Sequence, residues 1–489
     1  MSGPAASADV AARRSRGRRT AAVVATAVLL AALTALTFLG TTSVGFFDPA
    51  DAGGLVFFAV ASWVVFAAAV LLLFRTGRAG GGRASVVLVL VGAVALGGAA
   101  LAGPPTTSTD SARYAWDGIV QVAGHSPYDH TPADQAYASL RPDWLYPAPV
   151  LDDGGHPQCV GEGSRVARTL NVPDFSVLCT TINRPQVPTI YPPAAELYFA
   201  AVRAVVPADA PYWPLQASGL LLSLGVTAAL LLALRKRGLD PRWAALWAWC
   251  PFVLSEAVTN SHVDVLAALL VLVATLLVAG GRRWRGGIAL GAAIAVKLVP
   301  LIAAPALLRR QPWKVIVAAT LTFAVLYVPY VLLSGIGVIG YLPGYLSEEG
   351  YDDGTRFALV SLVAPGSASV VVAALLMLLL AVVVWRRSDP ASPFTGQLWM
   401  IGGTMLIVTP HYSWYALLLV PFIVMTGRWE WLAVPLALTA GLLLPELWIA
   451  RLALLAAGAL VAVVWMRRHR FGVRRARAGG RTNLTVSWR

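Results

Sequence analysis

The chain is divided into uncharged apolar runs, many of them about twenty residues long, which end at short clusters of Arg or Lys. A membrane hydrocarbon core is about 30 Å thick and a helix rises about 1.5 Å per residue, so such runs are long enough to cross it. Only 13% of the residues are charged and 57% are hydrophobic, whereas roughly a quarter of a soluble domain is charged. The sequence therefore predicts an all-α polytopic membrane protein.

The basic clusters give the expected direction of each run, because short cytoplasmic loops carry an excess of Lys and Arg. They also account for the net charge of +14, so no nucleic-acid partner is implied. The pattern predicts a bundle of about twelve full transmembrane helices with both termini cytoplasmic. The expected spans are 20–47, 53–74, 84–103, 212–234, 243–255, 265–281, 315–335, 366–385, 394–409, 413–426, 431–444 and 452–466.

The run from Gly286 to Leu308 does not fit this alternation. It has room for one span, yet both of its flanks are basic, and Lys297 and Pro300 lie near its middle. Two half-length helices that enter and return on the same side satisfy both length and charge, because broken helices are tolerated where they line a polar cavity. We therefore expect a re-entrant helix pair here.

These expectations divide the chain into four parts in a plasma membrane. They are a basic cytoplasmic N-terminus (1–19), two additional spans (20–83), a transmembrane catalytic domain (84–466) and a basic cytoplasmic tail (467–489). Two exterior loops interrupt the third part, a large one at 104–211 and a second at 336–365.

The first exterior loop contains the one long polar stretch of the chain, from Asp110 to Pro193. Asp110, Arg113, Tyr114 and Asp117 are spaced i, i+3, i+4 and i+7, so on a helix they share one face. A carboxylate at a membrane exit suits a general base, an Arg suits a phosphate and a Tyr can orient a hydroxyl. The alternative is a polar loop whose charges are merely solvated.

Other ionisable residues occur where membrane spans usually avoid them. A charge within a span costs about 2.5 to 3.5 kcal/mol on insertion scales, so such groups usually face a site or a partner. For His262 and His411 the alternative is a position at the membrane–water interface without a functional role. The candidates are Glu256, His262, Asp264, Lys297 and His411.

The three cysteines are too few for a disulfide scaffold or a thiolate metal site. Cys159 and Cys179 lie in the exterior loop, where thiols oxidise, and we expect them to form a disulfide; Cys250 lies in an apolar run and should stay a thiol. The carboxylates lack a compact ligand spacing, so we expect no metal and no cofactor.

Four motifs in this order resemble the polytopic glycosyltransferases of the GT-C superfold, and most closely glycosyltransferase family 87, which includes polyprenyl-phosphate-mannose-dependent α-mannosyltransferases. The likeness extends over about Ala84 to Pro421. The motifs are D-x-x-R-Y-x-W-D-G-x-x-Q-x-x-G-x-x-P-Y at Asp110–Tyr128, I-N-R-P-x-V-x-T-I-Y-P-P at Ile182–Pro193, W-x-P-x-V-L-x-E at Trp249–Glu256 and N-x-H-V-D at Asn260–Asp264.

The resemblance implies that Asp110 is the catalytic base of an inverting sugar transfer. The donor would be a polyprenyl-phosphate sugar, with mannose as the implied sugar, and the acceptor a glycolipid or cell-envelope glycan on the exterior face. Arg113, Lys297 and His411 are the candidates for holding the phosphate, and Tyr191 is a further candidate substrate contact. Every expected cytoplasmic loop is short, which agrees with a lipid-borne donor that needs no soluble nucleotide-binding domain.

Two rival functions share the membrane setting. A secondary transporter or lipid flippase would also explain a charge at Lys297, although a large polar loop on one side only is of little use to it. A lipid-linked oligosaccharide polymerase or ligase would use a similar substrate. The insertion Pro147–Cys179 is read either as a lid over the acceptor or as decoration, and the acidic stretch Glu348–Arg356 departs from the family pattern.

Overall fold

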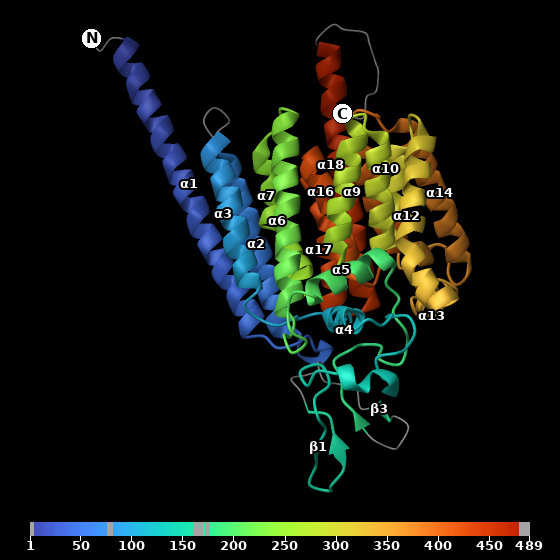
Figure 1. Cartoon of the computed structure of the whole chain (residues 1–489). Helices are drawn as coiled ribbons and strands as arrows, with labels where there is room; N and C mark the ends of the chain where they lie inside the picture. The colour runs from blue at the N-terminus through green and yellow to red at the C-terminus, as the bar shows by residue number, and fades with distance from the viewer. Residues whose placement is uncertain (1–3, 76–81, 161–169, 172–176, 479–489) are drawn as a thin grey trace.

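The computed structural model describes residues 4–75, 82–160, 170–171 and 177–478, and it is a bundle of roughly parallel helices capped at one end (Figure 1). The protein is an all-α polytopic membrane protein. Among the described residues, seven helices are long and apolar enough to cross a membrane, or eight if one bent pair counts as a span. The seven are Thr20–Thr42, Gly53–Arg75, Arg83–Ala100, Trp213–Lys236, Pro312–Glu348, Ala368–Arg387 and Leu447–Arg468.

Six of these segments belong to single helices, α1 (Pro4–Thr42), α2 (Gly53–Arg75), α3 (Gly82–Ala100), α6 (Trp213–Lys236), α14 (Ala368–Arg387) and α18 (Leu447–Ala478). The segment Pro312–Glu348 begins with α12 (Pro312–Ser334) and continues through η7 (Gly335–Ile339) and α13 (Leu342–Glu348). The count of about twelve full spans is not confirmed by this criterion. The expected spans at 394–409, 413–426 and 431–444 are short apolar helices of 10–17 residues. They are α15 (Phe394–Val408), η9 with α16 (Ser413–Leu418, Val420–Thr426) and η10 with α17 (Trp429–Leu432, Ala433–Leu443).

The segment expected as one span at 243–255 is not a continuous helix. The chain there passes through η4 (Pro241–Ala244), α7 (Ala245–Ala248) and α8 (Pro251–Leu254). Cys250 interrupts the helix with φ −65° and ψ 121°, because a residue before proline is pushed out of the helical region. The residues on both sides of the break are apolar because they are buried in the bundle, and this composition led us to expect one span.

The bent pair is Pro251–Thr259 and Asp264–Ala279, which meet at 115°. Its first half ends in a π-helical turn, η5 (Ser255–Thr259), and its second half is α9 (Asp264–Ala279). Between the two halves, Ser261 has φ +50°, a conformation that residues other than glycine rarely adopt. This bend carries the Asn260–Asp264 motif.

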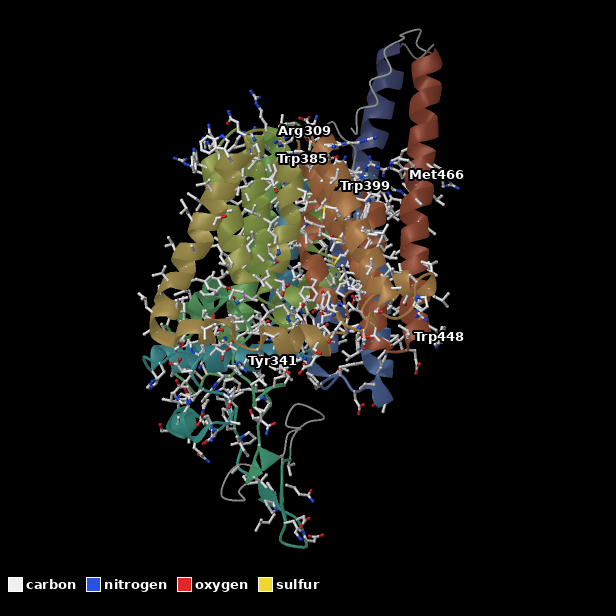
Figure 2. All side chains as sticks on the ribbon, turned by 90° about the vertical axis from the view of Figure 1, so that its right-hand side faces the viewer. Arg309, Tyr341, Trp385, Trp399, Trp448 and Met466 are labelled. Atoms are coloured by element: carbon white, nitrogen blue, oxygen red, sulfur yellow. A yellow bond between two sulfur atoms is a disulfide. The ribbon has the colours of Figure 1, made fainter. Side chains whose placement is uncertain are left out.

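The run around Lys297 is broken as expected. Helix α10 (Arg283–Val296) ends where Lys297 becomes extended, and η6 (Val299–Ala303) and α11 (Ala304–Leu307) lead back. Arg283 and Lys314 line one pocket, so the segment between them enters the bundle and returns to the same end. Arg309 lies at that end, opposite Tyr341 (Figure 2). We call this the basic end.

The opposite end is capped by two helices that lie across the bundle, α4 (Asp110–Val122) and α5 (Pro193–Arg203) (Figure 1). Helix α4 buries every residue from Ser111 to Val120, so the Asp110 stretch is a packed helix and the solvated-loop alternative is wrong. We call this end the capped end. The starts of α1 and the final turns of α18 lie away from it.

Beyond the cap project η2 (Gln135–Leu140) and two small antiparallel hairpins. Strand β1 (Val150–Leu151) pairs with β2 (Pro157–Gln158), and β3 (Leu170–Asn171) pairs with β4 (Val177–Leu178). A disulfide joins Cys159 and Cys179, with Cα atoms 5.4 Å apart, and Cys250 is a buried thiol. Much of the insertion Pro147–Cys179 lies outside the described residues. The remaining short helices are η1 (Pro49–Asp51) and η8 (Val360–Leu362).

Small residues bring α10 close to its neighbour α12. A Cβ added to Gly287 would lie 2.7 Å from the Val315 carbonyl oxygen, and one added to Gly291 would collide with the Ala319 carbonyl oxygen. Van der Waals packing through small residues is how membrane helices associate without a hydrophobic driving force between them. The close packing fixes α10, and with it the position of Lys297.

Candidate active site

A cavity of about 700 Å³ lies where the capped end meets the bundle. One part of its wall is apolar and formed by η6, α14 and α15, including Leu301, Met377 and Met405. The other part is polar and formed by α4, the segment before α5 and the loop after α13. Its charged lining residues are Asp110, Arg113, Arg184, Lys297 and Arg356.

Asp110 is the first residue of α4, and its carboxylate is 13% exposed. Its Oδ1 accepts a hydrogen bond of 2.8 Å from the Asn183 amide, and its Oδ2 lies 3.4 Å from the Tyr191 hydroxyl, which donates to it. The Oδ2 is also 3.7 Å from Nδ1 of His262. The carboxylate is thus oriented by neutral donors and a histidine, with its face on the cavity.

The loop that leads into Asp110 is fixed by Asn260. The Asn260 Oδ1 accepts from the backbone amides of Thr106 and Thr107 at 3.0 and 3.1 Å, and its Nδ2 donates to the Thr107 hydroxyl at 2.8 Å. Asn260 is fully buried. The first residue of the N-x-H-V-D motif therefore positions the start of α4, and it does not line the cavity.

His262 lies between two carboxylates. Its Nδ1 faces Asp110, and its Nε2 is 3.3 Å from Oε2 of Glu256, whose Oε1 accepts from the Ser413 hydroxyl at 3.2 Å. The imidazole is fully buried and stacks on Trp414, with ring centroids 3.8 Å apart. Neither ring nitrogen makes a hydrogen bond with the described residues, so the imidazole is positioned by its stacking on Trp414 and by the two nearby carboxylates.

Lys297 forms an ion pair with Asp264, from the bend before α9. Its Nζ lies 2.7 Å from Oδ2 of Asp264 and 4.4 Å from the ring centre of Tyr415. Asp264 is 1% exposed and does not line the cavity, whereas Lys297 does. Lys297 therefore lines the cavity, while its counter-ion Asp264 is buried outside the cavity wall.

The other three cations of the cavity follow the same arrangement. Arg113 binds Asp117 through Nε at 2.8 and 3.0 Å, and Arg184 binds Glu348 at 2.8 Å. Arg356 is 2% exposed and forms an ion pair with Glu349. None of these carboxylates lines the cavity, so Asp110 is the one lining carboxylate that the described residues provide.

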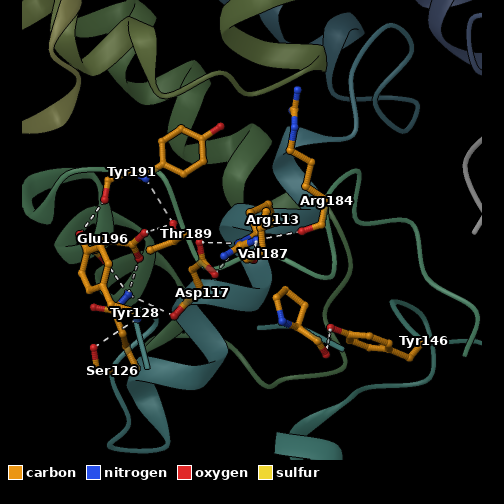
Figure 3. A network of polar contacts seen from close by, with 12 residues as sticks. Arg113, Asp117, Ser126, Tyr128, Tyr146, Arg184, Val187, Thr189, Tyr191 and Glu196 are labelled. Carbon is orange, nitrogen blue, oxygen red and sulfur yellow. Dashed lines mark hydrogen bonds and ion pairs between the residues drawn. The ribbon is translucent and has the colours of Figure 1, made fainter. Parts of the chain in front are cut away.

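Asp117 belongs to a polar network that ties α4 to α5 (Figure 3). Glu196 accepts from the Thr189 hydroxyl at 2.7 Å and from the Gln121 amide at 2.9 Å. Burial raises the pKa of Asp117, and the Arg113 charge opposes that rise. Burial also raises the pKa of Glu196 well above its usual range, and the nearby Asp117 adds to the effect. This network ties α4 to the segment before α5, and neither Asp117 nor Glu196 lines the cavity.

The structure divides the residues expected from the sequence into two groups. Asp110, Arg113, Tyr191 and Lys297 line the cavity. The others do not line it: Tyr114, Asp117, Glu256, His262 and Asp264 are buried and His411 is half-exposed.

Three of the expected substrate contacts lie against other protein groups. Tyr114 stacks on Phe199 with ring centroids 4.4 Å apart, and Asp117 is engaged by Arg113. His411 lies 3.5 Å from Glu349. Burial and the neighbouring Arg356 lower the pKa of His411, which favours a neutral imidazole that is poorly suited to hold a phosphate by charge.

Sequence reasoning missed Asn183, Arg184 and Arg356. Asn183 and Arg184 lie within the Ile182–Pro193 motif, which was a usable signal for them. Arg356 is the first cation after the acidic Glu348–Asp353 stretch, and that sequence is typical of a solvated loop. Within the described part of the chain, no group of three His, Cys, Asp or Glu is arranged to hold a metal ion.

Residues 189–410 match the family model described as Glycosyltransferase family 87. The match includes Tyr191, Glu256, His262 and Lys297, and it ends just before His411. No curated protein and no solved structure matches the chain. The suspected resemblance is confirmed, and the protein is a membrane glycosyltransferase with a family 87 domain over residues 189–410.

Proposed function

We propose that the protein transfers a mannosyl residue from a polyprenyl-phosphate donor to a hydroxyl of a glycolipid or cell-envelope glycan, with inversion at the anomeric carbon. Mannose and the acceptor class rest on the family likeness. The form of the donor and the role of Asp110 rest on the cavity as well.

The observation that carries the proposal is the composition of the cavity wall. One side offers four cations, Arg113, Arg184, Lys297 and Arg356, and a single carboxylate, and the other side is formed by Leu, Ile, Val and Met side chains. A sugar phosphate on a long apolar chain matches both sides at once. A water-soluble nucleotide sugar would leave the apolar side unused.

Asp110 is the proposed general base. Its Oδ2 takes the proton of the acceptor hydroxyl while that oxygen forms a bond to the anomeric carbon and the bond from this carbon to the phosphate oxygen breaks. The phosphate leaves with the bonding electrons, and the cations stabilise its charge without having to protonate it. His262, held by Glu256, keeps Oδ2 oriented toward the acceptor.

The proposed orientation places the capped end outside the plasma membrane. The disulfide lies on that side, where thiols oxidise, and the Arg and Lys clusters lie at the basic end. Under this orientation both termini are cytoplasmic, and the donor is used on the exterior leaflet.

The test is purified protein in lipid vesicles supplied with polyprenyl-phospho-mannose and an extract of envelope glycolipids. A new mannosylated lipid with inverted anomeric configuration, identified by mass spectrometry and NMR, supports the proposal. Movement of the donor between leaflets without any new glycoside would support the flippase alternative. Transfer of whole oligosaccharides, with no use of the single-sugar donor, would support the polymerase or ligase alternative.

A further inference from the structure

The basic end contains a second pocket, of about 440 Å³, which the proposed sugar transfer does not use. It lies between the first residues of α10 and α12. The residues that matter for its chemistry are Arg282, Arg283, Trp284, Arg285, Gln311 and Lys314. We call this the basic pocket.

The basic pocket concentrates positive charge without neutralising it. Four of its lining residues are Arg or Lys, and none of the four has a carboxylate within 4.0 Å in the part of the chain that the structure describes. This contrasts with the catalytic cavity, where each lining cation has a carboxylate partner. A cluster of like charges that no protein group compensates favours an anionic ligand.

The surroundings of the Arg283 side chain also indicate a ligand, independently of the net charge of the pocket. It is 8% exposed, and its Nη1 is buried with no hydrogen-bond partner among the described residues. A buried, charged donor without a partner is costly, so such groups usually have a ligand, ion or water that completes them. Because Arg283 lines the pocket, a ligand there would supply the missing acceptor.

The backbone adds to the same potential. Helices α10 and α12 both begin at the pocket, and neither has an acidic residue in its first turn or a side chain that caps it. The N-terminus of a helix carries unsatisfied N–H groups and about half a positive charge, which suits a phosphate group. Two such ends and four cations therefore converge on one space.

Two tryptophans indicate where the anion comes from. Trp284 and Trp313 are 44% and 54% exposed, and their rings meet edge to face with centroids 5.4 Å apart. Exposed Trp at a helix end is typical of the headgroup level of a membrane. Further along α12, Ile316, Leu321 and Val325 are exposed and offer an apolar face for acyl chains.

We propose that the basic pocket binds the phosphate of an anionic membrane phospholipid, at the end of the molecule opposite the catalytic cavity. Basic pockets between transmembrane helices bind such headgroups in this way. The acyl chains would follow the exposed face of α12. The site is separate from donor binding, because the pocket shares no lining residue with the catalytic cavity.

Purified protein in a neutral detergent tests this directly. Titration with phosphatidylglycerol, phosphatidylcholine or inorganic phosphate is followed by native mass spectrometry and by the melting temperature. We expect phosphatidylglycerol alone to be retained and to raise the melting temperature. The triple variant Arg283→Gln, Arg285→Gln, Lys314→Gln should bind it about 100-fold more weakly, since each of the three cations contributes roughly fivefold.

Two controls separate the site from general charge and from misfolding. Arg386→Gln removes an exposed cation next to Trp385, which lies at the same end of the molecule (Figure 2), and should change nothing. Arg283→Lys keeps the charge and should retain most of the binding, which a misfolded variant could not do. Equal retention of both lipids, or an unchanged affinity in the triple variant, would overturn the proposal. Equal stabilisation by inorganic phosphate would overturn the lipid assignment.

Discussion

Asp110 and Asp117 lie two turns apart on one helix and have opposite surroundings. Asp110 lines the cavity and is held by Asn183, Tyr191 and His262. Asp117 is 1% exposed and is held by the guanidinium of Arg113. The Asp110 carboxylate faces the cavity and is open to a substrate hydroxyl, whereas both oxygens of Asp117 accept from the single Nε–H of Arg113 in an ion pair.

The two aspartates belong to two kinds of carboxylate at the capped end, one that lines the cavity and one that is a buried counter-ion. Each cation of the cavity has a carboxylate behind it, which keeps the buried charge compensated and the cation in place. Asp110 has no Arg or Lys partner within 4.0 Å in the described residues. Variants at the two kinds of carboxylate should therefore separate turnover from stability.

The largest expected effect is on turnover in Asp110→Asn. The amide keeps the shape and can still accept from Asn183, but it cannot take the acceptor proton, so turnover should fall about 10² to 10⁴-fold with little change in melting temperature. Rates of product formation and thermal unfolding measure the two effects. Asp143→Asn, at an exposed site in the same loop, is the matched control. Near-normal turnover in Asp110→Asn would remove the base role from this residue.

The next largest effect is on stability in Arg113→Met. The change leaves Asp117 and Glu196 buried without their cation, and such a loss typically costs about 3 to 5 kcal/mol. The backbone carbonyls of Arg184 and Val187 also lose the donor that binds them. Denaturant unfolding should show this cost, and the double variant Arg113→Met, Asp117→Leu should recover part of it. A single variant as stable as wild type would mean that Arg113 mainly serves a ligand.

Much of this comparison could be predicted from the sequence. Helical spacing placed Asp110, Arg113, Tyr114 and Asp117 on one stripe, and α4 has that register. Periodicity could not predict the ion pair between Arg113 and Asp117 or the position of Glu196 near Asp117. These contacts depend on how α5 packs across α4.

The limits elsewhere have similar causes. Charge and length together predicted the break at Lys297, since both constraints are local. The residues at 243–255 were expected to form one continuous helix because the interior of a large bundle is as apolar as lipid, so short broken helices there have the same composition as a span. Arg356 was missed because its burial depends on the cavity wall that distant helices build.

Variants of Lys297 test whether a cation that is already paired with a buried carboxylate also binds the donor phosphate. Lys297→Met should weaken donor binding by roughly tenfold or more and also destabilise the protein, because Asp264 stays buried and charged. Lys297→Arg should restore much of both. In the double variant Lys297→Met, Asp264→Asn the buried charge is gone, so stability should return while donor affinity stays low. If donor affinity returned together with stability, Lys297 would be only a structural counter-ion.

The smallest effect concerns the pH dependence of stability and rests on Glu196. Its pKa in the folded protein is raised well above the usual range by burial and by Asp117. The folded state therefore keeps this proton to a higher pH than the unfolded state does. The resulting stabilisation is complete below the ordinary Glu pKa and is lost as pH rises through the folded value. Each unit of difference is worth about 1.4 kcal/mol.

Glu196→Gln copies the protonated form and cannot ionise, so its melting temperature should fall less than that of wild type as the pH is raised from 5 to 9. Its amide oxygen can still accept from Thr189, which should preserve the fold at low pH. Glu446→Gln removes an exposed carboxylate and should keep the wild-type slope. Parallel curves for wild type and Glu196→Gln would show that Glu196 has the same pKa in the folded and unfolded states. Its burial beside Asp117 would then make no contribution to the pH dependence of stability.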